Sequence, residues 1–160
     1  MNSRLNVIVA IILGWSAICL QVSVAPRIAL FGALPDFPLI VLLAFCPAFT
    51  RVQAAVFGFF LAVGYGGTIG ANLWQCVVSY SISGFVLAWI NDYRVTPNVP
   101  VMFATGFFGT ILARLLFMFV AAPPGIASYL GATILSALYN GVLVLPLYAL
   151  LKRFLDPTFR

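Results

Sequence analysis

The sequence predicts an all-α polytopic membrane protein with about six transmembrane helices. Of its 160 residues, 64% are hydrophobic and only 7% are charged, and the mean hydropathy is +1.15. Such values exclude an ordinary soluble domain. The apolar runs follow one another with short connections between them. We therefore expect a single integral membrane domain over residues 1–160.

Each apolar run predicts one helix. In chain order, the runs are residues 5–24, 37–49, 52–67, 71–90, 99–120 and 126–151. Crossing the hydrocarbon core takes about 20 residues, which all but the second and third runs supply easily. We expect the second and third helices to be short. Whether these two helices span the membrane or form a re-entrant hairpin stays open, because both alternatives return the chain to the same face.

The charged residues predict the orientation of the helices. With six spans, one face of the membrane carries Arg4, Arg51, Arg94, Lys152, Arg153 and Arg160, and the other carries Arg27. The positive-inside rule then places both termini in the cytoplasm. Trp89 and Tyr93 fit an aromatic belt at the inner interface, and Trp74 fits one at the outer interface.

Few groups suited to catalysis are present in the chain. It has no histidine and no glutamate, and its three acids, Asp36, Asp92 and Asp156, are far apart in the sequence. General acid–base and nucleophilic catalysis need such groups in close pairs, so we do not expect an enzyme. Three cysteines without a CxxC spacing predict no metal or other cofactor. The net charge of +5 forms no contiguous basic face, so nucleic acid is not an expected partner.

Arg114 is the charged residue deepest in an apolar run. An arginine at the bilayer centre costs around 2.5 to 3.5 kcal/mol on insertion scales, and less near an interface. In one interpretation its long side chain reaches the outer interface without a specific partner. In the other it forms an ion pair with Asp36 and joins the second helix to the fifth.

Two further polar residues have structural interpretations. In "PDFP", Asp36 is placed to cap the second helix by accepting a hydrogen bond from the N–H of Leu39, with Pro38 in the first turn. Asn140 lies near the middle of the sixth run. A buried asparagine there usually bonds to a neighbouring helix, which contributes roughly 0.6 to 2 kcal/mol.

Four segments in order carry a resemblance to a known family. They are a first span, "LPDFPLIVLLAF", "RVQAAVFGFFLAVGY" and the closing "LYNGVLVLPLYALLKRFL". Together they resemble the rod shape-determining protein MreD family. The resemblance implies a fold similar to the substrate-binding subunits of vitamin (ECF-type) transporters. It also implies a non-catalytic subunit of the bacterial cell-elongation complex, in the inner membrane. The chain lacks an acid that the family commonly carries before the Gly-rich turn, here "GGTIGAN" at residues 66–72, so no role of that acid carries over.

The same resemblance implies partners. These are the membrane segment of MreC, the actin-like MreB, and the glycosyltransferase and transpeptidase of peptidoglycan synthesis. Arg51, Arg94, Lys152 and Arg153 would then face cytoplasmic partners or anionic lipid headgroups. The simpler interpretation is that these residues only orient the helices. The oligomeric state, including a homodimer, stays open.

One alternative belongs to a different class of protein. A small-molecule or lipid-binding subunit of a transporter would hold its ligand in an outward-facing pocket lined by a few polar groups. Asp36, Asn72, Gln75, Arg114 and Gln21 are the residues that could supply them. A general assembly factor for another membrane complex is a third alternative.

Overall fold

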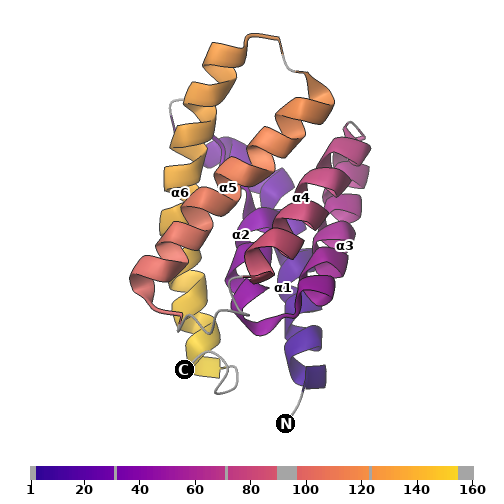
Figure 1. The fold of residues 1–160 in the computed structure, drawn as a ribbon, viewed down its shortest axis with the longest axis vertical. Coiled ribbons are helices and arrows are strands. Elements are labelled where there is room, and N and C mark those ends of the chain that lie inside the picture. The colour runs from indigo at the N-terminus through magenta and orange to yellow at the C-terminus, as the bar shows by residue number, and fades with distance from the viewer. Residues whose placement is uncertain (1–2, 31, 71, 90–96, 123, 155–160) are drawn as a thin grey trace.

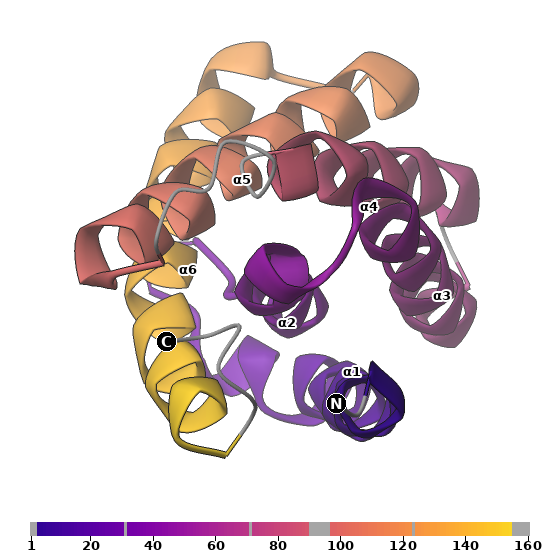
Figure 2. The same cartoon turned by 60° about the horizontal axis from the view of Figure 1, so that its bottom comes forward.

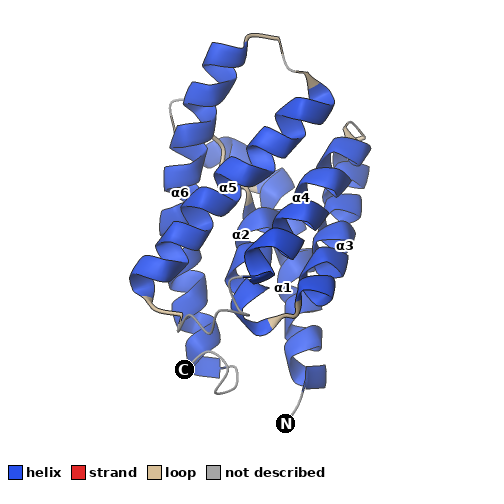
Figure 3. Cartoon of the chain, in the orientation of Figure 1, coloured by secondary structure: helices blue, strands red, loops and turns tan. Residues whose placement is uncertain are grey.

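The computed structural model describes residues 3–30, 32–70, 72–89, 97–122 and 124–154. These residues form six α-helices and two short 3-10 helices, with no β-strand among them (Figure 3). In order, the elements are α1 (Ser3–Ser23), η1 (Ala25–Ile28), α2 (Phe37–Phe45), η2 (Cys46–Ala48), α3 (Arg51–Ile69), α4 (Leu73–Ala88), α5 (Val99–Ala121) and α6 (Ile126–Phe154). The predicted all-α class is confirmed.

Three of the helices, α3, α5 and α6, are long and apolar enough to cross a membrane. Large apolar side chains on the outer surface of the bundle are exposed, such as Trp15 on α1 at 68% and Phe119 on α5 at 80%. A surface of this kind belongs in lipid. The chain therefore has the build of an integral membrane protein.

Two predicted helix lengths are wrong. The third helix is not short, because it has 19 residues and continues through the Gly-rich turn as far as Ile69. It ends where Gly70 adopts the left-handed conformation, with φ of 69°, which glycine reaches without strain. The fourth helix is shorter than its apolar run, with 16 residues from Leu73 to Ala88. Asn72, just before it, is also left-handed, with φ of 60°, so the helix cannot begin earlier.

The second helix, α2, lies at the centre of the bundle, with the other five helices around it (Figure 2). It contacts every one of them. Eight of its nine residues, from Pro38 to Phe45, are buried. At 1.5 Å per residue, α2 rises only about 13 Å, less than half of the hydrocarbon core. A helix this short can sit at membrane depth because protein, not lipid, surrounds its ends.

The remaining helices form two antiparallel pairs beside α1, namely α3 with α4 and α5 with α6 (Figure 1). Glycines let each pair approach closely. A Cβ added at Gly58 of α3 would lie 2.6 Å from the Tyr80 carbonyl oxygen of α4, and one at Gly106 of α5 would lie 2.8 Å from Gly141 Cα of α6. In membranes the lipid is as apolar as the helix surfaces, so the hydrophobic effect does not drive helices together. Close packing at small residues does so instead.

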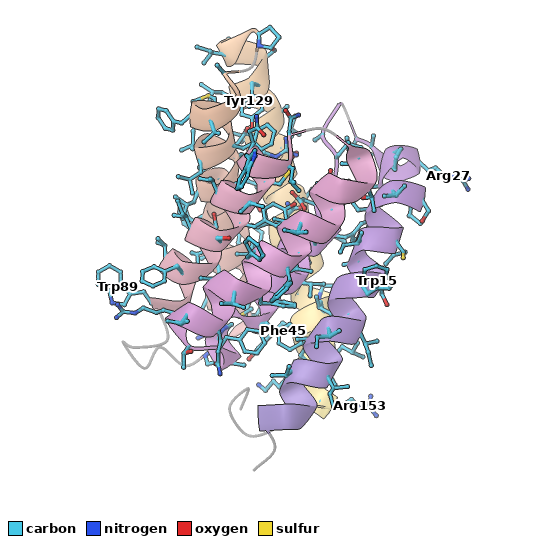
Figure 4. The ribbon with its side chains drawn as sticks, turned by 90° about the vertical axis from the view of Figure 1, so that its right-hand side faces the viewer. Trp15, Arg27, Phe45, Trp89, Tyr129 and Arg153 are labelled. Carbon is cyan, nitrogen blue, oxygen red and sulfur yellow. The ribbon has the colours of Figure 1, made fainter. Side chains whose placement is uncertain are left out.

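We call the end at which α1, α3 and α5 end the distal end, and the opposite end the proximal end. Helix α1 begins and α6 ends at the proximal end (Figure 1). Arg153 projects near the proximal end and Arg27 near the distal end (Figure 4). Arg94, Asp92, Tyr93, Asp156 and Arg160 lie outside the described residues, and of the Arg4 side chain nothing is described.

Candidate functional site

A cavity of about 210 Å³ opens near the distal end of the bundle. It is lined by Gln21, Leu34, Pro35, Asp36, Tyr65, Cys76, Ser79, Tyr80, Ala113, Arg114, Phe117 and Tyr129. These residues come from α1, from the segment before α2, and from each of the four helices α3 to α6. Tyr129 lies near the distal end (Figure 4). Every outer helix thus contributes to one site.

The cavity extends from near the distal end toward the middle of the bundle. Tyr129 is three residues after the start of α6, and Arg114 is seven residues before the end of α5. At 1.5 Å per residue these positions are roughly 5 and 10 Å from their helix ends. Asp36 lies deeper, because its N–H bonds to Asn140, which is fourteen residues, or roughly 21 Å, after the start of α6.

Asp36 caps α2 as the sequence predicts. Its Oδ1 atom accepts a hydrogen bond from the N–H of Leu39 at 3.2 Å. The same oxygen accepts a second hydrogen bond from the Tyr80 hydroxyl at 2.5 Å, which joins the cap to α4. Among the described residues, no hydrogen bond is made to Oδ2. Half of the carboxylate therefore remains available to the cavity.

Arg114 holds its place on α5 through contacts with α6. One guanidinium nitrogen, Nη2, donates to the Ser136 hydroxyl at 3.4 Å, and the Arg114 carbonyl accepts from the Tyr129 hydroxyl at 3.0 Å. The guanidinium also interacts with the Tyr129 hydroxyl. An arginine carries five N–H donors, which is more than these two contacts need.

The direct ion pair between Asp36 and Arg114, one of the two interpretations of Arg114, is not formed. Their side chains share the cavity and interact electrostatically, but no hydrogen bond or ion pair joins them. The physical reason is that each is held elsewhere, Asp36 by Tyr80 of α4 and Arg114 by Ser136 of α6. The other interpretation, in which Arg114 has no specific partner, is also wrong, because Arg114 bonds to Ser136.

Aromatic rings form a wall of the cavity beside Asp36. The rings of Tyr65 and Tyr80 are stacked, with centroids 6.5 Å apart and planes at 10°. Phe117 and Tyr129 complete the aromatic lining. Tyr80 meets Asp36 through its hydroxyl, so this side of the cavity offers a carboxylate and phenol groups.

A polar frame beneath the cavity holds the non-helical segment that leads to α2. Asn140 of α6 accepts a hydrogen bond from the Asp36 N–H at 3.0 Å and donates one to the Thr110 hydroxyl of α5 at 3.1 Å. Gln21 of α1 accepts from the Phe37 N–H at 2.7 Å and donates to the Pro35 carbonyl at 3.0 Å. Non-helical backbone is tolerated at membrane depth only with such partners. The predicted bond from Asn140 to a neighbouring helix is confirmed.

The other predicted residues lie away from the cavity. Asn72 and Gln75, named as pocket groups for a transporter subunit, do not line it. The guanidinium carbon of Arg51 lies 4.8 Å from the centre of the Trp89 ring, a cation–π contact. Lys152 and Arg153 are exposed in the last turn of α6. Arg94 is outside the described residues.

Sequence reasoning missed the tyrosines of the cavity and Ser136. A signal for Tyr80 was present, because it lies ten residues into the 71–90 run, far from either predicted interface. A tyrosine at such a depth needs a partner for its hydroxyl. A search for buried acceptors would have pointed to Asp36.

The chain matches no protein-family model, no curated protein and no solved structure with which it was compared. Any function must therefore be argued from its own residues. The cavity combines one carboxylate, one guanidinium and three phenols. Such groups are suited to holding a polar ligand by charge and hydrogen bonds.

Proposed function

We propose that this chain is a non-catalytic membrane subunit of the bacterial cell-elongation (rod) complex, of the MreD type. Its role would be to scaffold MreC and the peptidoglycan synthases and so maintain cell shape. The observation that carries the proposal is the contact between two of the segments on which the MreD resemblance depends. Asp36, from "LPDFPLIVLLAF", donates its N–H to Asn140 of the closing segment at 3.0 Å. Two residues on which the resemblance depends therefore hold the start of the central helix α2 in place.

The proposed mechanism is recognition inside the bilayer. Partners there associate through close packing of apolar helix faces rather than through water-driven burial. The exposed apolar side chains of α1 and α3, including Ile11, Trp15, Val52 and Phe60, offer such faces to the membrane segment of MreC. A fold of the kind found in the substrate-binding subunits of vitamin (ECF-type) transporters is part of this proposal.

The proposal places the chain in the bacterial inner membrane, with six passes and both termini in the cytoplasm. It is supported by Arg153 near the proximal end and Arg27 near the distal end. The Arg51–Trp89 contact fits an inner interface, where aromatic rings and cations gather. Arg51, Lys152 and Arg153 would orient the chain, or in addition contact anionic headgroups or MreB.

Depletion of the protein in a rod-shaped bacterial host tests the cellular role. We expect cells to become round and tagged MreC to co-purify with the intact chain from detergent extracts. The Gly58→Ala variant should fail to restore the shape, because its Cβ would meet backbone of α4. Gly67→Ala, a helical glycine with open space around it, is the matched control and should restore the shape. Normal rods after depletion would overturn the proposal.

A second candidate is a small-molecule or lipid-binding subunit of a transporter, and the cavity favours it. Asp36, Arg114 and Gln21 meet there as that interpretation requires. Gene neighbourhood separates the two candidates. A neighbouring gene for an MreC-like coiled-coil protein favours elongation, whereas neighbouring ATPase genes favour transport. Co-purification of an ATPase in place of MreC would decide for the transporter subunit.

A further inference from the structure

Two opposite charges share the distal cavity without meeting. Asp36 makes no hydrogen bond through Oδ2 with the described residues, and Arg114 has more N–H donors than its contacts with Ser136 and Tyr129 need. Both side chains are half-buried. Charges removed from water are costly unless they are paired and hydrogen-bonded. A ligand with a positive group for Asp36 and a negative group for Arg114 would pair with both charges.

The volume of the cavity limits the size of a ligand that can bind in it. A cavity of about 150 Å³ accepts benzene, so this larger one has room for roughly eight to ten non-hydrogen atoms. Its volume is about 210 Å³. A single water molecule would leave most of this space empty. Phosphoethanolamine, with its phosphate and its ammonium two carbons apart, is of the right size.

The chemistry of the two ends differs. At one end, the Asp36 carboxylate and the phenol oxygens of Tyr65 and Tyr80 can accept hydrogen bonds from an ammonium group. At the other end, the planar guanidinium of Arg114 suits the oxygens of a phosphate, which it can bind with two parallel hydrogen bonds. One negative and one positive group in the site match a ligand with no net charge.

We propose that the distal cavity binds a small zwitterion carrying an ammonium and a phosphate, namely the headgroup of an aminophospholipid such as phosphatidylethanolamine. The position of the site supports the lipid as the source, because the cavity opens near the distal end of a bundle whose outer surface is apolar and belongs in lipid. Arg114 and Tyr129 lie roughly 10 and 5 Å below their helix ends. The inference depends on the cavity alone, and neither a scaffold nor a transporter subunit is assumed.

Lipid selectivity of the purified full chain tests the proposal without any partner. The protein would be delipidated in detergent, and binding of short-chain phosphatidylethanolamine and phosphatidylglycerol would be measured by native mass spectrometry. We expect at least about a tenfold preference for phosphatidylethanolamine, because phosphatidylglycerol offers the phosphate without an ammonium. Equal binding of the two lipids would overturn the proposal.

Substitutions in the cavity separate binding from folding. Asp36→Asn keeps an oxygen that can cap α2 but removes the charge, and should abolish the preference between the two lipids. Arg114→Gln should weaken binding of both lipids about tenfold or more. Arg27→Gln, at the same end but outside the cavity, is the matched control and should bind as the wild type does. Unchanged lipid selectivity in Asp36→Asn, or unchanged lipid affinity in Arg114→Gln, would refute the assignment.

A milder variant covers the case in which the charge variants fail to fold. Tyr80→Phe removes only the hydroxyl that holds Asp36 and should lower the affinity for phosphatidylethanolamine several-fold. Tyr139→Phe, which loses a bond to the Ile28 carbonyl outside the cavity, is its control and should not change it. Soluble phosphoethanolamine is the last arm. Competition with the lipid supports the shared chemistry, whereas binding of the soluble compound without any lipid binding overturns the lipid as the source.

Discussion

The central helix α2 and the outer helix α6 are both apolar in sequence, yet they occupy opposite environments. Helix α2 has nine residues, and Leu39, Leu42 and Leu43 have no exposed surface. Helix α6 has 29 residues, and buried and exposed side chains alternate along it. In a bilayer, lipid is as apolar as a protein core, so hydropathy cannot tell the centre from the periphery. Helix length does distinguish the centre from the periphery, because a helix of nine residues must have its ends shielded by protein.

The two helices also differ in what their polar neighbours do. The segment before α2 ends inside the bundle, so its backbone groups bond to Gln21, Ser136 and Asn140. The end of α6 reaches the proximal surface, where Lys152 and Arg153 are exposed. Contacts around α2 should therefore dominate stability, and contacts on the outer surface should contribute little.

The largest expected effect is the loss of a ring beside α2. Phe45 is fully buried, stacks on Phe49 at 5.3 Å between centroids and meets Phe57 edge-on at 6.0 Å. Phe45→Ala should lower the free energy of unfolding by on the order of 3 kcal/mol through lost packing and a cavity. SDS titration of the protein in mixed micelles measures this. Phe119→Ala, on the lipid-facing surface of α5, should leave the midpoint unchanged. Equal losses in both variants would remove the distinction between centre and periphery.

A close helix contact next to α2 gives the second effect. The Cβ of a Gly58→Ala variant would lie 2.6 Å from the Tyr80 carbonyl oxygen, so α3 and α4 must move apart. We expect a loss of about 1–3 kcal/mol and a lower thermal midpoint in detergent, followed by tryptophan fluorescence. Gly67→Ala on the same helix meets nothing within 4 Å and should be neutral or slightly stabilising. A stable Gly58→Ala variant would show that the helix pair tolerates separation.

Loss of Asn140 should have the third effect. Asn140→Ala removes the acceptor of the Asp36 N–H and the donor to Thr110, and should cost about 1–2 kcal/mol of unfolding free energy. Hydrogen exchange of the Asp36 amide is the sharper measurement, because that N–H would lose its partner. Gln75→Ala, which breaks no hydrogen bond seen in the described residues, is the control. Full protection of the Asp36 amide in Asn140→Ala would contradict the proposed frame.

The smallest expected effect is at the periphery. Trp89→Leu keeps an apolar side chain but removes the ring that Arg51 covers at 4.8 Å, and should lower stability by about 0.5–1 kcal/mol. The measurement is again SDS titration, with Trp74→Leu on an exposed part of α4 as the control. A loss as large as that in Phe45→Ala would mean that the outer surface matters as much as the centre.

Local features of the fold were predictable from the sequence. The cap of α2 was predicted because Asp36 and the Leu39 N–H are only three residues apart. The order of the six helices followed from apolar runs and their interruptions. The predicted lengths of α3 and α4 were wrong because the Gly-rich turn stays helical as far as Ile69, and Asn72 then adopts a left-handed conformation. Hydropathy shows neither feature.

The sequence by itself determined the class of the protein, its helix order and the cap at Asp36, because hydropathy and capping act over a few neighbouring residues. Only the tertiary structure decided which distant residues meet. Asp36 and Asn140 are 104 positions apart, yet they share a hydrogen bond. Packing also turned Asp36 toward Tyr80 and Arg114 toward Ser136, so the two charges line one cavity without pairing. The physical reason is that each side chain takes the partner that the converging helices bring within hydrogen-bonding distance.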